Sequence, residues 1–247
     1  MIAEIDVFLE IGPDGECLAH ALDLPGCVLR GKSQSEVMTT MENTAGEYLA
    51  WLTRHGEDVE LLEPLTLRIV GTTFGAGPFR RGDQAALVAA DMHPPTREEM
   101  EKVYFRRAAY AHQDLFALVE GLSDEVLGWR ENMDAMTIRE ILRHIGNAEQ
   151  WYISRLVPVE TLPSEWNHDG EMPELEFLDM ARRTAIERLR VLTQAELSAI
   201  TCPEHWTNHP EERWTVRKAL RRMLEHELEH IAHIRQILEA FRNQDRD

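Results

Sequence analysis

The stretch MLEHELEHIAHIRQIL, residues 223–238, places three histidines among leucines and isoleucines. At about 100° per residue, His226, His230 and His233 form one column beside the apolar stripe of an α-helix. Two histidines at positions i and i+4 can bind one metal ion through neutral imidazoles. The same spacing also occurs in core helices whose histidines are only hydrogen-bonded. The stretch therefore predicts a helix and leaves both interpretations of its histidines open.

A second segment, MTIREILRHIGNAEQWYISRL at residues 136–156, carries His144 at the edge of its own apolar stripe. A histidine from such a facing helix would complete a set of three protein ligands. Three ligands leave a position for water or substrate, which is typical of a catalytic metal site rather than a structural one.

The chain from residue 96 onward has a helical period throughout. Capping-box patterns start at Thr96 and Thr137, and Thr215 opens the last helix. The predicted helices are 96–121, 137–156, 173–192 and 215–242. Four helices of this length are typical of a bundle, in which side chains on facing helices build metal sites. We therefore expect an all-α four-helix bundle over residues 96–247.

The first 70 residues have a different pattern. Alternation of apolar and polar residues predicts strands, and turn signals such as Pro13–Gly15 separate them. A helix starts at the N-cap Ser33, and one more strand follows Pro64. The expected order is β-β-β-α-β, an α+β domain over residues 1–70. Glycines and prolines without a sustained period then predict a linker over 71–95.

Composition argues against several classes of partner. The 247 residues include 26 Lys+Arg and 44 Asp+Glu, a formal charge of −18, which argues against binding to nucleic acid or anionic lipid. No apolar run reaches the ~18 residues of a membrane span. The acidic N-terminus does not resemble a signal peptide. The three cysteines have no zinc or redox spacing, and we expect reduced thiols in a cytoplasmic protein.

The first 70 residues are acidic, and their only cations are Arg30, Lys32, Arg54 and Arg68. Tight binding to duplex DNA needs several cationic phosphate contacts, so DNA binding is not expected. A short sheet with open edges is suited to strand pairing with a protein partner or a second copy. We therefore expect a homodimer.

The two helical segments at 136–156 and 223–238 together resemble the DinB-like superfamily. This resemblance implies a four-helix bundle with a three-histidine divalent metal site, zinc or nickel, whose ligands here are His144, His226 and His230. Many members carry Gln where this chain has His233, so His233 is a candidate to influence the ligands indirectly. Glu227, near the middle of the apolar stripe, is a second such candidate, because a buried carboxylate needs a partner.

Characterised members of that superfamily include thiol-dependent S-transferases and isomerases. The resemblance thus implies a metal-dependent enzyme, a thiol transferase or related hydrolase, that brings a low-molecular-weight thiol to a small electrophile. A metal suits this chemistry because it lowers the pKa of a bound thiol. No other nucleophile constellation, P-loop or dinucleotide fingerprint is present in the sequence.

The stretch ALDLPGCVLRGKSQSEVMTTMENTAGEYLAWL, residues 21–52, is similar to the HicB antitoxin-like fold. In antitoxins this module binds a small toxin nuclease and is followed by a DNA-binding segment, which is not evident here. The alternative function is therefore a non-catalytic protein in which the HicB-like module holds a partner and the bundle contributes stability or dimerisation.

Overall fold

The computed structural model describes residues 2–59, 61–75, 86–162, 164, 166, 170 and 172–244. The chain divides into two compact units, Met1–His93 and Pro94–Asp247. Each unit is described separately below.

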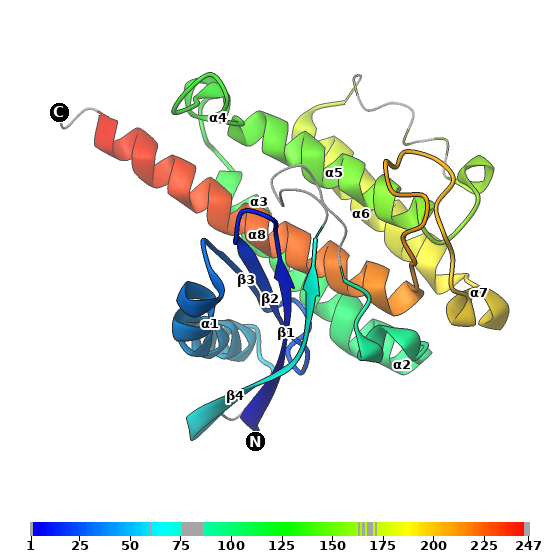
Figure 1. The fold of residues 1–247 in the computed structure, drawn as a ribbon. Coiled ribbons are helices and arrows are strands. Elements are labelled where there is room, and N and C mark those ends of the chain that lie inside the picture. The colour runs from blue at the N-terminus through cyan, green and yellow to red at the C-terminus, as the bar shows by residue number, and fades with distance from the viewer. Residues whose placement is uncertain are drawn as a thin grey trace. The chain divides into compact units, whose positions relative to one another are not determined.

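The first unit contains a four-stranded sheet and one long helix (Figure 1). The sheet has the order β3-β2-β1-β4, in which β1 pairs antiparallel with β2 and parallel with β4. Its elements are β1 (Ile2–Ile11), β2 (Cys17–Ala21), β3 (Val28–Gly31), α1 (Gln34–Arg54) and β4 (Leu61–Phe74). The predicted β-β-β-α-β order is thus confirmed.

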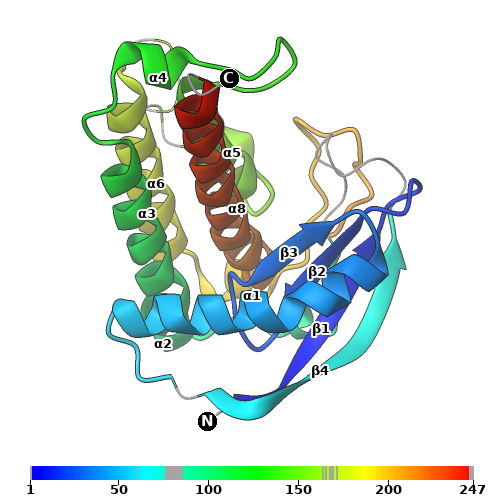
Figure 2. The same cartoon turned by 90° about the vertical axis from the view of Figure 1, so that its left-hand side faces the viewer.

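Helix α1 packs on the sheet, where it contacts β2, β3 and β4 (Figure 2). The Ser33 side chain accepts a hydrogen bond from the backbone N–H of Glu36, so this residue is the N-cap that the sequence predicts. The core between helix and sheet consists of fully buried apolar side chains, including Ile5, Val7, Leu9, Val37, Met41, Ala45 and Leu52. The alternating strand pattern therefore identifies the buried face correctly.

Strand β4 is longer than the sequence predicts. The expected strand covers residues 65–70, whereas β4 runs from Leu61 to Phe74 and pairs with β1 as far as Ile11↔Phe74. The tertiary pairing with β1 extends the strand into a glycine-containing stretch that has no apolar period of its own. The predicted linker 71–95 therefore begins inside a strand, and its residues 76–85 lie outside the described part of the chain.

The second unit is helical, as predicted, and its long helices run alongside one another in Figure 2. Short helices α4 (Asp124–Gly128) and α7 (Gln194–Ser198) lie between longer ones. The long helices are α3 (Arg106–Val119), α5 (Ile138–Ser154), α6 (Glu174–Arg190) and α8 (Val216–Asn243). Thr137 and Thr215 accept hydrogen bonds from the backbone N–H three residues later, so the sequence places the start of α5 and α8 correctly.

The first predicted helix, 96–121, is not a uniform α-helix. It consists of α2 (Arg97–Glu99), a π-helical stretch η3 (Met100–Phe105) and α3. A π-helical turn rotates the following residues relative to an unbroken α-helix, so periodicity counted from Thr96 loses its register within this helix.

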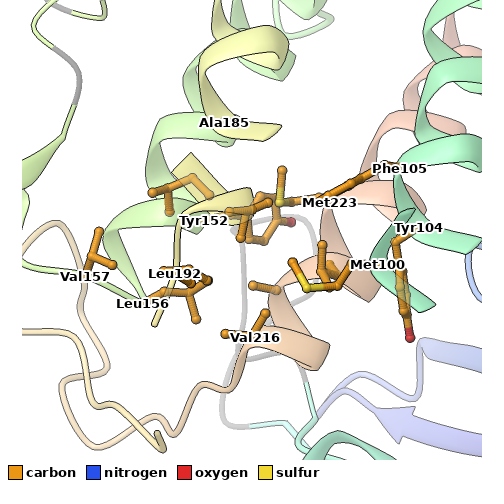
Figure 3. Packing of buried hydrophobic residues seen from close by; sticks show 14 of the residues in the cluster. Met100, Tyr104, Phe105, Tyr152, Leu156, Val157, Ala185, Leu192, Val216 and Met223 are labelled. Carbon is orange, nitrogen blue, oxygen red and sulfur yellow. The ribbon is translucent and has the colours of Figure 1, made fainter. Parts of the chain in front are cut away.

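The long helices pack around a hydrophobic core. Part of this core is drawn in Figure 3, where Tyr152 lies close to Met223 and Tyr104 lies apart from both. Trp214, Phe177, Ala181, Ala185 and Leu220 belong to the same cluster and are almost completely buried. None of the helices that the structure describes is both long and apolar enough to traverse a bilayer.

Gly146 allows α5 and α6 to approach closely. A Cβ atom at this position would lie 2.6 Å from Cε1 of Phe177 and 2.8 Å from its Cδ1. Phe177 is fully buried and cannot easily move aside. We expect Gly146→Ala to lower the free energy of unfolding by about 1–3 kcal/mol through overpacking.

Gly128, at the end of α4, provides the control, because a Cβ atom there meets nothing within 4 Å. Gly128→Ala should leave stability unchanged or slightly raised. Chemical denaturation of both variants measures the difference. Equal stability of the two variants would contradict a close approach at Gly146.

Candidate metal centre

Three histidines from two helices converge in the second unit. Nε2 of His226 lies 3.0 Å from Nε2 of His144 and 3.2 Å from Nε2 of His230. One ligand atom from each of the three residues lies within 4.8 Å of the other two. Among the described His, Cys, Asp and Glu residues, these three histidines are the ones that lie close enough together to hold one metal ion.

Local structure explains how these side chains meet. His226 and His230 are one turn apart on α8, so their imidazoles point to the same side of that helix. His144 comes from α5, which packs against α8. The capping box of Thr137 and Glu140 fixes where α5 begins, two turns before His144.

The spacing of the nitrogen atoms matches a metal's coordination shell. Zinc binds histidine nitrogen at about 2.0–2.1 Å in tetrahedral geometry, which places two such nitrogens about 3.3 Å apart. The observed separations of 3.0 and 3.2 Å are close to that value. The donor set of three imidazoles also suits zinc and nickel better than magnesium or calcium, which prefer oxygen.

The protonation state of the cluster suits metal binding as well. Burial lowers the pKa of His144, although the residue as a whole remains exposed. The pKa of His226 is well below its usual value because of burial, with further contributions from His230 and His144. Imidazoles that stay neutral near pH 7 keep their lone pairs available for a metal.

His233 lies beside this cluster but is not part of it. Its ring stacks against His230 with centroids 6.2 Å apart. The group of converging ligand atoms contains His144, His226 and His230 and does not include His233. Burial lowers the pKa of His233, so it is a neutral neighbour of the cluster.

Glu227, next to His226 on α8, is completely buried. Its carboxylate is 2.9 Å from Nη2 of Arg182, and its Oε1 is 3.4 Å from Nδ1 of His112. Arg182 also donates from Nε to Glu149 at 3.1 Å. His112, Glu149, Arg182 and Glu227 come from α3, α5, α6 and α8, so this buried polar network ties the four long helices together. The charge of Arg182 also contributes to the lowered pKa of His226.

Sequence reasoning missed three members of this network. Arg182 lies between Leu178 and Ala185 on the apolar stripe of α6, and Glu149 lies between Ile145 and Tyr152 on that of α5. His112 holds a similar place on α3. The signal available in the sequence was a charged residue on the apolar stripe of a helix. Only Glu227 was predicted to need a buried partner on this ground.

The family profile of the DinB superfamily matches residues 107–234, which are 128 of the 247 residues and include all the histidines above. The chain belongs to the DinB superfamily. A solved structure, YfiT from Bacillus subtilis, is described as a probable metal-dependent hydrolase with an unusual four-helix bundle topology. Its similarity to this DinB-superfamily chain has a TM-score of 0.47 at 20% identity and covers 64% of this chain and 94% of YfiT. No curated protein matches the chain significantly.

Proposed function

We propose that the second unit binds one divalent metal ion through His144, His226 and His230 and acts as a metal-dependent enzyme. The convergence of the three Nε2 atoms at the spacing of a coordination shell carries this proposal. Zinc or nickel would suit the donor set. Exposure of His144 makes the cluster reachable by a small molecule.

The chemistry that we propose is transfer of a low-molecular-weight thiol to a small electrophile, or a related hydrolysis. A bound divalent ion would supply Lewis acidity, which lowers the pKa of a thiol or water near neutral pH. The chain's own histidines contribute neutral nitrogen ligands, and three of them leave room for an exogenous ligand. His233 and Glu227 are proposed to act on the ligands only indirectly, through ring stacking and through the rigidity of α8.

Metal analysis of the untagged protein tests the metal site. We expect one equivalent of a divalent metal in the unaltered chain and none in His230→Ala. His205→Ala is the control, because it removes an imidazole from an exposed loop of the same unit. Unchanged metal content in His230→Ala would sink the ligand assignment. A screen of thiols and electrophiles with the metal-loaded protein then tests catalysis.

For the first unit, we propose a HicB-like module that holds a protein partner, with a second copy of the chain as that partner. Strand β4 lies at an edge of the described sheet and exposes Ile69, Val70 and Phe74, the last of which is 77% exposed. An edge strand with exposed apolar side chains favours pairing with another strand. The acidic balance of this unit disfavours nucleic acid, and the free thiols of Cys17, Cys27 and Cys202 suit a reducing compartment such as the cytoplasm.

Light scattering at micromolar concentration tests the association. We expect the mass of a dimer for the unaltered chain and a shift toward monomer for Phe74→Ser. Met133→Ser is the matched control, since Met133 is an 86% exposed apolar residue in the second unit. A monomer in the unaltered chain would refute the proposal.

A further inference from the structure

Arg155, which directly follows α5, carries a buried positive charge that no carboxylate of the described residues contacts. The residue is only 1% exposed. Its Nε and Nη2 donate to Oγ of Ser154 at 3.3 and 2.9 Å, and Nη2 also donates to the backbone oxygen of His205 at 2.6 Å. These acceptors are all neutral. In the part of the chain that the structure describes, Nη1 of Arg155 is buried and has no hydrogen-bond partner.

Other buried arginines of the second unit are paired differently. Arg182 and Arg221 each contact at least one carboxylate. The carboxylate of Glu212 acts on Arg155 electrostatically, but its Oε1 lies 2.8 Å from Nζ of Lys218. Burial lowers the pKa of Arg155 to about 10, so the guanidinium is still charged at neutral pH. A buried charge without a counterion is costly, and a bound anion would supply the counterion that Arg155 lacks.

A second buried donor near Arg155 also lacks an acceptor. Trp214 is 1% exposed, and within the described ranges its indole Nε1 has no hydrogen-bond partner. Thr201 joins the two residues, because its hydroxyl donates to the backbone oxygen of Arg155 at 2.5 Å and its backbone N–H donates to that of Trp214 at 2.9 Å. Both side chains also lie against the indole of Trp151. The surroundings of Arg155 therefore contain hydrogen-bond donors without acceptors, which suit an anion.

We propose that Arg155 forms a binding site for a small oxyanion, such as sulfate, phosphate or a carboxylate group. The guanidinium supplies the charge, and Nη1 supplies N–H groups that donate to the oxygens of the anion. Arg155 lies about three turns of helix beyond His144, so this site is separate from the three-histidine cluster and does not require the proposed metal.

The loop 202–213 contacts this site and is held in a strained conformation. Arg155 donates to the backbone oxygen of His205, and Nε1 of Trp151 donates to that of Trp206 at 2.9 Å. Trp206 has a φ of +52°, a conformation that residues other than glycine rarely adopt. Strained residues of this kind gather at ligand clamps and switch regions. We therefore expect the anion to reach Arg155 by displacement of this loop.

The test measures sulfate binding to the full chain by isothermal titration calorimetry, with the ionic strength held constant by sodium chloride. We expect Arg155→Gln to weaken sulfate binding about ten-fold or more, because a hydrogen bond between charged groups is lost. Arg183→Gln is the matched control, since Arg183 is 60% exposed and pairs with Asp179, and it should keep the affinity. His230→Ala should keep it as well. Phosphate and acetate, titrated in the same way, show which kind of oxyanion the site prefers.

The outcomes separate this inference from the metal site. Equal sulfate affinity in the unaltered chain and in Arg155→Gln would overturn the anion site, and so would the absence of sulfate binding to the unaltered chain. Affinity that is lost in His230→Ala but kept in Arg155→Gln would overturn it too, because the anion would then bind at the three histidines. Crystals of the unaltered chain grown with selenate give a test that does not depend on the folding of a variant. We expect an anomalous peak about 3 Å from Nη1 of Arg155. A map without a peak at Arg155 would refute the proposal.

Discussion

Replacing Arg182 by Met is expected to lower the free energy of unfolding by about 3–5 kcal/mol, because it leaves two buried carboxylates without their cation. Arg182 is 5% exposed and contacts Glu149, which is 2% exposed, and Glu227, which is fully buried. The methionine would fill much of the same volume, so the lost ion pairs rather than a cavity dominate the effect. Chemical denaturation followed by circular dichroism measures it.

The adjacent Arg183 provides a control of the same residue type. Its side chain is 60% exposed and pairs with Asp179 one turn away, so Arg183→Met should change stability by less than about 1 kcal/mol. Similar losses in both variants would mean that Arg182 is not part of a desolvated network.

The loss in Arg182→Met should also depend on pH. Burial raises the pKa of Glu149, and Arg182 is the main influence that opposes this. The pKa of Glu149 is raised even with the arginine present, so its loss makes the folded protein bind a proton on Glu149 still more readily than the unfolded chain does. The destabilisation relative to the unaltered chain should therefore be largest near pH 7 and shrink as the pH falls toward the usual range of a glutamate. A difference that is constant with pH would contradict this role of Glu149.

The second large effect concerns the proposed metal. A ligand that binds only the folded state stabilises it by about 2.7 kcal/mol at one hundred times its dissociation constant and by about 4.1 kcal/mol at one thousand times. We therefore expect excess Zn²⁺ or Ni²⁺ to raise the melting temperature of the unaltered chain by about 5–15 °C, and chelation to reverse the rise. His226→Ala should abolish this response, since His226 lies between the other two histidines.

His205→Ala again separates site-specific binding from general effects of the metal on histidines. It should keep the full metal-dependent shift. A shift of the same size in His226→Ala and in the unaltered chain would place the stabilising metal elsewhere. Differential scanning fluorimetry with and without chelator provides the measurement.

The sequence by itself determined the helices that carry the histidines. Threonines at positions 137 and 215 cap α5 and α8 through local hydrogen bonds, and apolar residues at helical spacing define the buried faces. The i, i+4 relation of His226 and His230 follows from helix geometry alone. These features depend on neighbours within a few residues, which is why they could be predicted without a fold.

Strand β4 and the helix after Thr96 show where local signals were insufficient. Pairing with β1 carries β4 to Phe74 through residues without strand periodicity, and the π-helical stretch η3 changes the register of the first long helix. Both features depend on contacts that the local sequence does not specify. The predicted linker therefore starts too early, inside β4, and the prediction of a uniform first helix was wrong.

Only the tertiary structure decided which polar side chains meet. His144 is 82 residues from His226 in the chain, yet their nitrogens are 3.0 Å apart. Arg182 of α6 joins Glu149 of α5 and Glu227 of α8, although the three residues lie far apart in the sequence. Such contacts depend on the rotation and depth of each helix in the unit. These are set by the packing of many apolar side chains together, so no single stretch of sequence encodes them.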